Sequence, residues 1–365
     1  MNNYRLLVCG LSNNNGGIET TIQNYCRILL KTGCQIDFLV HCDTIANENE
    51  LINLGCNVFK TVAPRDNFLK YRREINHILK SKKYDIIWDN RDSLANIYLL
   101  FTAKNIGIPI RIVHGHTMTN LGGSVKGLLH QLIKNIFIKH IANRYWAVSQ
   151  ASARYFYSEN ILRSRYFNII PNCIDFNEYK FDAKIRETWR KKNKIARKIV
   201  LVVGRLQYPK NQELIIRCLT YLQNKNTNLI LAGDGADTQK LQFLAKEMGV
   251  GDMCYFLGMV GKKEIINLLM ASDVFVMPSF NEGLPLAYLE AQAAGLPCVI
   301  SHVIPKEADI SYDIVRLSPL DTPQNWAKAI DKMLLNKKRN KLTEKHTVFS
   351  LESKEIYLMN IIEGK

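Results

Sequence analysis

Apolar residues occur along the chain in short runs, and each run is followed by a polar loop and a helix-like stretch. The first such unit has an apolar run at 5–10, an Asn- and Gly-rich loop, and an amphipathic pattern from about 17 to 30. A short continuous apolar run indicates a buried strand, and three- and four-residue spacing indicates a helix. Further strand-like runs lie at 35–41, 57–61, 85–89, 110–114, 145–149 and 167–170. This alternation predicts a parallel, doubly wound sheet.

A second series of strands and helices follows a break in composition. Residues 179–198 are strongly basic and helical in pattern, without a clear apolar run. Strand-like runs then recur at 199–203, 227–232, 253–256, 274–277 and 297–300. The chain has 365 residues, more than the roughly 250–300 that one hydrophobic core usually supports. We therefore predict the α/β class with two such domains in tandem.

Composition indicates a soluble globular protein, with 47% hydrophobic and 22% charged residues. The nine cysteines form no Cys-x-x-Cys pair, and several lie inside apolar runs, which favours buried thiols in a reducing cytoplasm. We expect no signal peptide, because no basic region with a long apolar core opens the chain. No stretch approaches the ~18 apolar residues of a transmembrane helix.

The net charge of +16 is concentrated in patches. Residues 60–83 hold eight basic and two acidic side chains, and residues 126–165 hold seven and one. These patches are either solvated helix faces or surfaces that attract an anionic membrane or an acidic lipid-pyrophosphate acceptor. We expect no nucleic-acid partner, because no recognised binding motif accompanies the charge.

The segment 125–147 adds an amphipathic pattern to one basic patch. Lysines are interspersed among apolar residues at three- and four-residue spacing, namely Leu128, Leu129, Leu132, Ile133, Ile136, Phe137 and Ile141. Such a helix either faces the core of the first domain or lies on an anionic membrane surface.

The most informative stretch is 278–301, where Glu282 and Glu290 flank an expected helix start. Pro285 suits the first helical position, since its missing N–H costs nothing there. The amides of Leu286 and Ala287 would then be unpaired donors at the positive end of a helix, which favours an anion. Two carboxylates around a phosphate-binding helix start suit a ligand with both phosphate and hydroxyl groups, such as a nucleotide-sugar.

The spacing Glu282-x7-Glu290 within EGLPLAYLEAQAAGLP resembles the signature of family 4 retaining glycosyltransferases of the GT-B fold, the "glycosyl transferases group 1" type of polysaccharide biosynthesis. Companion motifs stand in the expected order at 13–19 (NNNGGIE), 111–116 (RIVHGH), 172–175 (NCID), 204–211 (GRLQYPKN) and 233–235 (GDG). The resemblance extends from residue 4 to about residue 305. It implies two Rossmann-like domains facing across a cleft.

The resemblance also implies a role for each domain. Residues 1–175 would form the acceptor-binding domain, residues 176–345 the nucleotide-sugar-binding domain, and residues 346–365 a C-terminal helix returning to the first. It further implies contacts of Arg205 and Lys210 with the donor diphosphate, where they stabilise the leaving group.

Other donor contacts follow from the same motifs. Glu290 would accept hydrogen bonds from the ribose hydroxyls, since a carboxylate can serve both groups of a diol. Glu282 would contact the transferred sugar and stabilise positive charge at its anomeric carbon. The remaining donor-binding positions are implied as Gly16, Gly17, Gly233, Gly283, Leu284, Leu286 and Ala287. For Gly16, Gly17 and Gly233, ordinary glycine turns are the alternative.

His114 and His116 follow a strand-like run at the end where open α/β sheets place ligands. In similar enzymes a histidine at this point lies near the sugar or the acceptor, so we include both with Glu282 as candidate catalytic residues. A structural role is the alternative for each.

We expect no essential metal and no separate cofactor. The chain contains no Asp-x-Asp sequence, the usual metal-holding motif of other glycosyltransferases. The diphosphate charge must then be met by Arg, Lys and helix starts. The family is thought to react on one face of the sugar, with the leaving phosphate assisting deprotonation of the acceptor, so neither glutamate would be a covalent nucleophile.

The preferred function is a retaining hexosyl- or N-acetylhexosaminyltransferase that uses a UDP-sugar and a lipid-linked or polysaccharide acceptor, as in capsule or O-antigen synthesis. It would be cytoplasmic, with peripheral contact at the inner face of the plasma membrane. The alternatives are a UDP-sugar epimerase of the same fold and a non-catalytic nucleotide-sugar-binding subunit. No Gly-x-Gly-x-x-Gly follows a strand-like run, which argues against a nicotinamide dehydrogenase.

The chain departs from the family pattern at two places. Cys173 stands where the family commonly has glycine, and it would be strained if that position required a positive φ. The stretch 88–91 lacks the histidine often found there, which weakens inference about the acceptor side.

Overall fold

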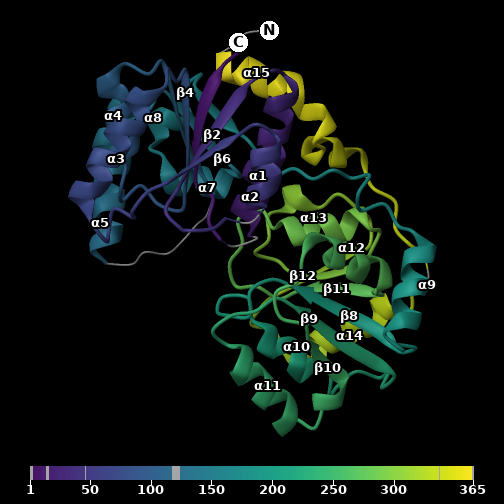
Figure 1. Ribbon diagram of the computed structural model, residues 1–365. Helices are drawn as coiled ribbons and strands as arrows, with labels where there is room; N and C mark the ends of the chain where they lie inside the picture. Colours follow the sequence, from purple (N-terminus) through teal and green to yellow (C-terminus); the bar gives the residue numbers. More distant parts are fainter. Residues whose placement is uncertain (1–2, 14–15, 46, 117–123, 337, 364–365) are drawn as a thin grey trace. The chain divides into compact units, whose positions relative to one another are not determined.

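The computed structural model describes residues 3–13, 16–45, 47–116, 124–336 and 338–363. The chain divides into two compact units (Figure 1). Unit 1 comprises Met1–Cys173 and Leu351–Lys365, and unit 2 comprises Ile174–Ser350. The C-terminal segment thus belongs to the same unit as the N-terminus.

Unit 1 is built on a seven-stranded parallel sheet with the order β3-β2-β1-β4-β5-β6-β7. Its strands are β1 (Arg5–Cys9), β2 (Gln35–Val40), β3 (Asn57–Lys60), β4 (Ile86–Arg91), β5 (Ile110–Gly115), β6 (Arg144–Ala147) and β7 (Phe167–Ile169). Its α-helices are α1 (Gly17–Lys31), α2 (Glu48–Asn53), α3 (Phe68–Ser81), α4 (Tyr98–Ile106), α5 (Val125–Leu132), α6 (Ile138–Ile141), α7 (Gln150–Phe156), α8 (Glu159–Leu162) and α15 (Glu355–Glu363). A π-helix, η1 (Ile133–Phe137), joins α5 to α6, and a 3₁₀ turn, η5 (Glu352–Lys354), precedes α15.

Successive side chains of a strand point to opposite faces, so each buried strand of unit 1 serves two cores. In β1, Leu6 and Val8 enter one core, and Leu7 and Cys9 enter the other. Helices α1 and α15 pack on the first face, while α3 and α4 pack on the second. Because both faces are covered, β1 is apolar from Leu6 to Cys9 rather than alternating, as expected for a strand of a parallel sheet.

Unit 2 repeats this construction with a six-stranded parallel sheet of order β10-β9-β8-β11-β12-β13. Its strands are β8 (Lys198–Val203), β9 (Thr227–Ala232), β10 (Cys254–Phe256), β11 (Val274–Met277), β12 (Cys298–Ser301) and β13 (Ile314–Leu317). Its α-helices are α9 (Ala183–Lys192), α10 (Gln212–Cys218), α11 (Thr238–Glu247), α12 (Lys262–Ala271), α13 (Leu286–Ala293) and α14 (Pro323–Leu334). Its 3₁₀ turns are η2 (Gly251–Met253), η3 (Lys306–Ala308) and η4 (Glu344–Phe349).

Helices again cover both faces of the sheet in unit 2. The face with Ile199 and Leu201 packs against α12 and α13, and the face with Val200 and Val202 packs against α10, α11 and α14. The predicted α/β class with two doubly wound parallel sheets is therefore confirmed.

Two local features differ from the sequence-based expectation. Strand β13 was not predicted, because its residues lie half-buried at the sheet edge and include Arg316, so they form no purely apolar run. The positive φ that would have strained Cys173 is also absent, since Cys173 is not one of the residues with a positive φ.

The amphipathic segment that begins at residue 125 faces the core only in part. Ile138 and Ile141 of α6 are buried. By contrast, α5 and η1 expose large apolar side chains, each at least 42% accessible: Val125, Leu128, Leu129, Leu132, Ile136 and Phe137. Within the described residues, no helix combines the length and apolar character that crossing a bilayer requires.

Candidate functional site

In unit 2 the strand order reverses between β8 and β11, because β9 and β10 extend the sheet on one side and β12 and β13 on the other. Open α/β sheets bind ligands at the carboxyl ends of the strands beside such a reversal. The loops that leave β8 and β11 carry Arg205, Lys210 and Glu282. The fold therefore brings together predicted site residues that lie more than seventy positions apart.

Lys210 and Glu282 form the closest contact of this site. The Lys210 ammonium donates to Oε1 of Glu282 at 2.6 Å, and the Ser279 hydroxyl donates to the same oxygen at 2.7 Å. The Glu282 side chain is 9% exposed and that of Lys210 is 27% exposed. One partly accessible cation thus lies against a nearly buried carboxylate, while Arg205 is exposed in the same loop.

The loops after β8 and β9 pack backbone against backbone at this edge. The amide of Leu206 donates to the Asp234 carbonyl at 3.0 Å. Gly233 has φ +143°, and a Cβ there would lie 2.1 Å from the carbonyl oxygen of Gly204. Gly233 is therefore required for the packing of this loop beside Arg205, and its contact with the donor stays a prediction.

The helix that follows Glu282 begins one residue later than predicted. Pro285 is the N-cap, with ψ 116°, and α13 begins at Leu286. Leu286 and Ala287 are consequently the first two helical residues, whose amides have no partner one turn earlier in the helix. Gly283 and Leu284 form the short connection from Glu282 to this helix start. Two of the predicted amides are thus placed at a positive helix end.

Glu290 lies within the first five residues of α13, and its Oε1 accepts a hydrogen bond from the Tyr179 hydroxyl at 2.9 Å. Burial raises the pKa of Glu290, while the bond from Tyr179 and the charge of Lys262 act in the opposite direction. The carboxylate therefore has one oxygen engaged within the protein.

The predicted histidines lie in unit 1, at the end of β5, and both are buried. The Trp88 indole N–H donates to Nδ1 of His114 at 3.4 Å, and Nε2 of His116 lies 2.8 Å from Oδ1 of Asn90. Burial lowers the pKa of His116 to about 3 and that of His114 well below its usual value. Both rings are thus neutral at pH 7. Any catalytic part would be hydrogen bonding rather than proton donation from an imidazolium.

Gly16 and Gly17 stand at the start of α1, as predicted, but a carboxylate already occupies this end. Gly16 is the N-cap, and a Cβ on it would lie 2.7 Å from Oε2 of Glu19. Oε1 of Glu19 accepts a hydrogen bond from the Ser12 hydroxyl. A donor phosphate at this helix start would have to compete with that carboxylate, so the role of the two glycines stays a prediction.

Sequence reasoning missed Tyr179 and Ser279. Ser279 stands three residues before Glu282, so the motif itself offered a signal. Tyr179 is 111 residues from Glu290, and no spacing rule connects them.

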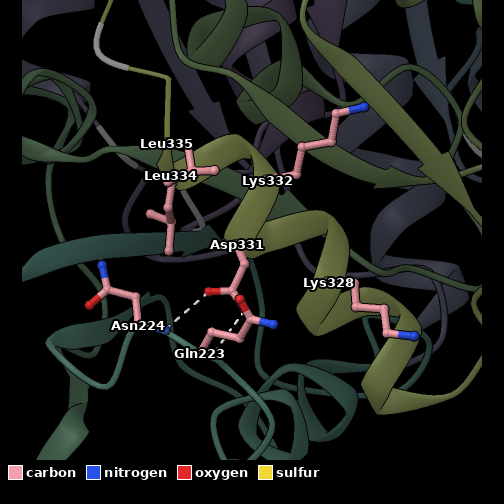
Figure 2. Close-up of a pocket in the computed structure, with 7 residues that line it drawn as sticks. All are labelled: Gln223, Asn224, Lys328, Asp331, Lys332, Leu334 and Leu335. Carbon is pink, nitrogen blue, oxygen red and sulfur yellow. Dashed lines mark hydrogen bonds between the residues drawn. The ribbon is translucent and has the colours of Figure 1, made fainter.

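Among the residues that the structure describes, no group of potential metal ligands lies near this site, and one pocket of unit 2 lies away from it. Across the part of the chain that the structure describes, no three potential His, Cys, Asp or Glu ligands cluster. A pocket of about 310 Å³ lies beside α14. In it, the Asp331 carboxylate accepts hydrogen bonds from the backbone amides of Gln223 and Asn224 (Figure 2). That loop precedes β9, so the pocket lies at the amino ends of the strands, opposite the site described above.

Comparison with known proteins finds a family model that matches each unit. The family model "Glycosyltransferase Family 4" matches residues 15–178, and "Glycosyl transferases group 1" matches residues 185–347. The chain is 28% identical over 326 residues to "Putative glycosyltransferase EpsF" of Bacillus subtilis, covering 87% of this chain and 84% of the relative.

A second relative is the UDP-Gal:alpha-D-GlcNAc-diphosphoundecaprenol alpha-1,3-galactosyltransferase of Escherichia coli. It is 29% identical over 238 residues, which is 62% of this chain and 60% of the relative. The crystal structure of Anabaena Alr3699/HepE in complex with UDP has a TM-score of 0.77 at 18% identity, covering 99% of this chain and all of that one. The chain belongs to the family 4 glycosyltransferases and has the GT-B fold.

Proposed function

We propose that this glycosyltransferase moves a hexosyl or N-acetylhexosaminyl group from a UDP-sugar to a hydroxyl of a lipid-linked or polysaccharide acceptor, with retention and without a metal. The observation that carries the proposal is the Lys210–Glu282 contact at the strand reversal of unit 2, beside Arg205 and the start of α13. Cations and a helix start suit a diphosphate, and carboxylates suit sugar hydroxyls.

The choice of donor and acceptor draws on the relatives. The Anabaena protein was solved with UDP and with UDP-glucose. The Escherichia coli relative is named for UDP-Gal and for a diphosphoundecaprenol-linked sugar. A polysaccharide of the capsule or O-antigen type is the corresponding product class.

The proposed reaction takes place on one face of the donor sugar. The bond between the anomeric carbon and the diphosphate oxygen breaks as the acceptor hydroxyl attacks from the same side. The acceptor proton passes to the leaving phosphate oxygen. Lys210 and Arg205 stabilise the charge that develops on the diphosphate, which is electrostatic stabilisation of the transition state. Glu282, held by Lys210 and Ser279, stabilises positive charge on the sugar rather than forming a bond to it.

Calorimetric titration with UDP, GDP and NAD in the presence of EDTA tests the donor site. We expect saturable binding of UDP that weakens about tenfold or more in Arg205→Ala, since a charge-assisted contact to phosphate is lost. The matched control is Arg217→Ala, whose guanidinium pairs with Glu213 on the surface of α10. Undiminished UDP binding by Arg205→Ala would refute the assigned site, and a requirement for added metal would refute metal independence.

We also propose peripheral attachment to an anionic membrane from the cytoplasm. The exposed apolar side chains of α5 and η1 support it, together with Lys126, Lys134 and Lys139 in a segment without acidic residues. Apolar insertion combined with basic charge is the usual basis of interfacial binding.

Cosedimentation with vesicles containing phosphatidylglycerol should show binding that Leu128→Ser weakens several-fold, because apolar area is lost from the interface. Leu128 is 66% exposed. The control Phe243→Ser removes a 63% exposed apolar side chain from α11 of unit 2 and should leave sedimentation unchanged. Equal effects of the two substitutions would contradict attachment through α5.

A further inference from the structure

Within the protein, the Tyr179 hydroxyl forms a hydrogen bond with Glu290, the carboxylate that is proposed to bind the ribose. It donates to Oε1 of Glu290 at 2.9 Å. Tyr179 lies in the segment that opens unit 2, before α9, whereas Glu290 lies on α13. The bond therefore joins two parts of unit 2 that the sequence keeps far apart.

Packing in the core of unit 2 holds the Tyr179 side chain in place, independently of its hydrogen bond to Glu290. The side chain is 2% exposed and belongs to the core formed with α12 and α13. The preceding residue, Glu178, pairs with Lys262 of α12 at 2.5 Å. A phenol held in a packed core has little rotational freedom, so the position of its hydroxyl is set by the fold.

A carboxylate has two oxygens with about four acceptor positions. The bond from Tyr179 to Oε1 restrains rotation of the carboxylate and uses one of these positions, so the remaining positions can accept from the hydroxyl groups of a ligand. It also favours the ionised form, which a buried carboxylate needs in order to accept from both hydroxyls of a diol.

We propose that Tyr179 is a positioning residue for the donor nucleotide. Its hydroxyl holds one oxygen of Glu290, so that the carboxylate meets the ribose hydroxyls in a fixed orientation. The proposal rests on the nucleotide-sugar site proposed above and adds a residue that lies outside the motifs of that site. Tyr179 acts through Glu290 and does not itself touch the nucleotide.

The test is Tyr179→Phe, which removes one oxygen and keeps the ring in the core. Affinity is measured by calorimetry for UDP and for 2′,3′-dideoxy-UDP, which lacks the ribose hydroxyls. UDP should bind about tenfold more weakly to the variant, as expected for loss of a hydrogen bond to a charged group. The dideoxy ligand should bind equally to wild type and variant, because it makes no use of Glu290.

The pH dependence of UDP binding gives a second measurement. Tyr179, Lys262 and Glu178 are the titratable groups that act on Glu290, and both the Tyr179 bond and Lys262 favour its ionised form. Without the Tyr179 bond the pKa of Glu290 rises further, so the loss of UDP affinity on acidification should begin at a higher pH in Tyr179→Phe.

Tyr288→Phe is the matched control. Tyr288 is buried on the same helix as Glu290, but its hydroxyl donates to Asp309 at 2.7 Å. This variant should keep the wild-type affinity and pH dependence. If wild type binds UDP but Tyr179→Phe leaves UDP affinity unchanged, or weakens both ligands equally, the positioning role is overturned. Absence of UDP binding by wild type would instead overturn the proposed function.

Discussion

Lys210→Ala is expected to lower kcat with a UDP-sugar by about a hundred- to a thousandfold, the loss typical when one preorganised group that stabilises developing charge is removed. In the free protein Lys210 lies 2.6 Å from Glu282 and is still 27% exposed, so its ammonium is accessible to a bound diphosphate. Since it would act on charge that grows as the sugar–phosphate bond breaks, kcat should fall by a larger factor than UDP affinity.

The measurement is steady-state transfer combined with calorimetric titration of UDP. Lys240→Ala is the matched control: this lysine is 68% exposed and pairs with Glu213 at 3.1 Å in the same unit. The control should retain wild-type kcat. Equal losses in kcat and in UDP affinity for Lys210→Ala would assign the lysine to ground-state binding and contradict its action on the leaving group.

Asp273→Asn is expected to destabilise unit 2 by about 3–5 kcal/mol, the usual cost of leaving a buried ion pair without one partner. Asp273 is 8% exposed and lies within 3.5 Å of cationic nitrogens of Arg186, Arg190 and Lys198. Asp273 also accepts a hydrogen bond from the backbone amide of Ile199 at the start of β8. Since Arg186 and Arg190 belong to α9, the carboxylate links α9 to the sheet.

Urea denaturation, followed by far-ultraviolet circular dichroism, measures this loss. Glu213→Gln removes a carboxylate that pairs with Arg217 and Lys240 at the surface, and should cost less than about 1 kcal/mol. A loss of unfolding free energy of similar size in both variants would contradict the larger contribution proposed for the buried ion pairs of Asp273.

The same carboxylate makes stability depend on pH. Burial alone would raise the pKa of Asp273, but Arg186, the Ile199 amide and Lys198 together hold it below its usual value. A depressed folded-state pKa means that the stabilisation is fully present above the unfolded pKa, about 3.9. It is lost as the pH falls from there through the lower folded value. The wild type should therefore lose more stability on acidification across that range than Asp273→Asn.

The sequence predicted the sheets well because strands covered by helices on both faces are continuously apolar. The runs at 5–10 and 227–232 correspond to β1 and β9 almost residue for residue. Strand β13 escaped detection because an edge strand is covered less completely and includes Arg316. The start of α13 was misplaced by one residue, since proline is compatible with either the N-cap or the first helical position.

For the candidate site, the sequence predicted which side chains take part but not how they are arranged. The motifs indicated that Lys210 and Glu282 serve one ligand, but their separation in sequence gave no distance between them. The strand order determines that distance. Because β11 pairs with β8 in parallel, the loops that follow these two strands leave the same edge of the sheet, and Lys210 reaches Glu282. The neutral histidines likewise follow from burial around Trp88 and Asn90, which no local pattern reveals.

The sequence by itself determined the α/β class, the tandem organisation and the family, because these depend on local periodicity and on motifs read in order. Tertiary structure alone decided that Glu290 is held by Tyr179, that Glu19 occupies the start of α1, and that Asp273 lies among three cations. The physical reason is that hydrogen bonds and ion pairs depend on distances of a few ångströms, and packing sets those distances between residues that no sequence spacing relates.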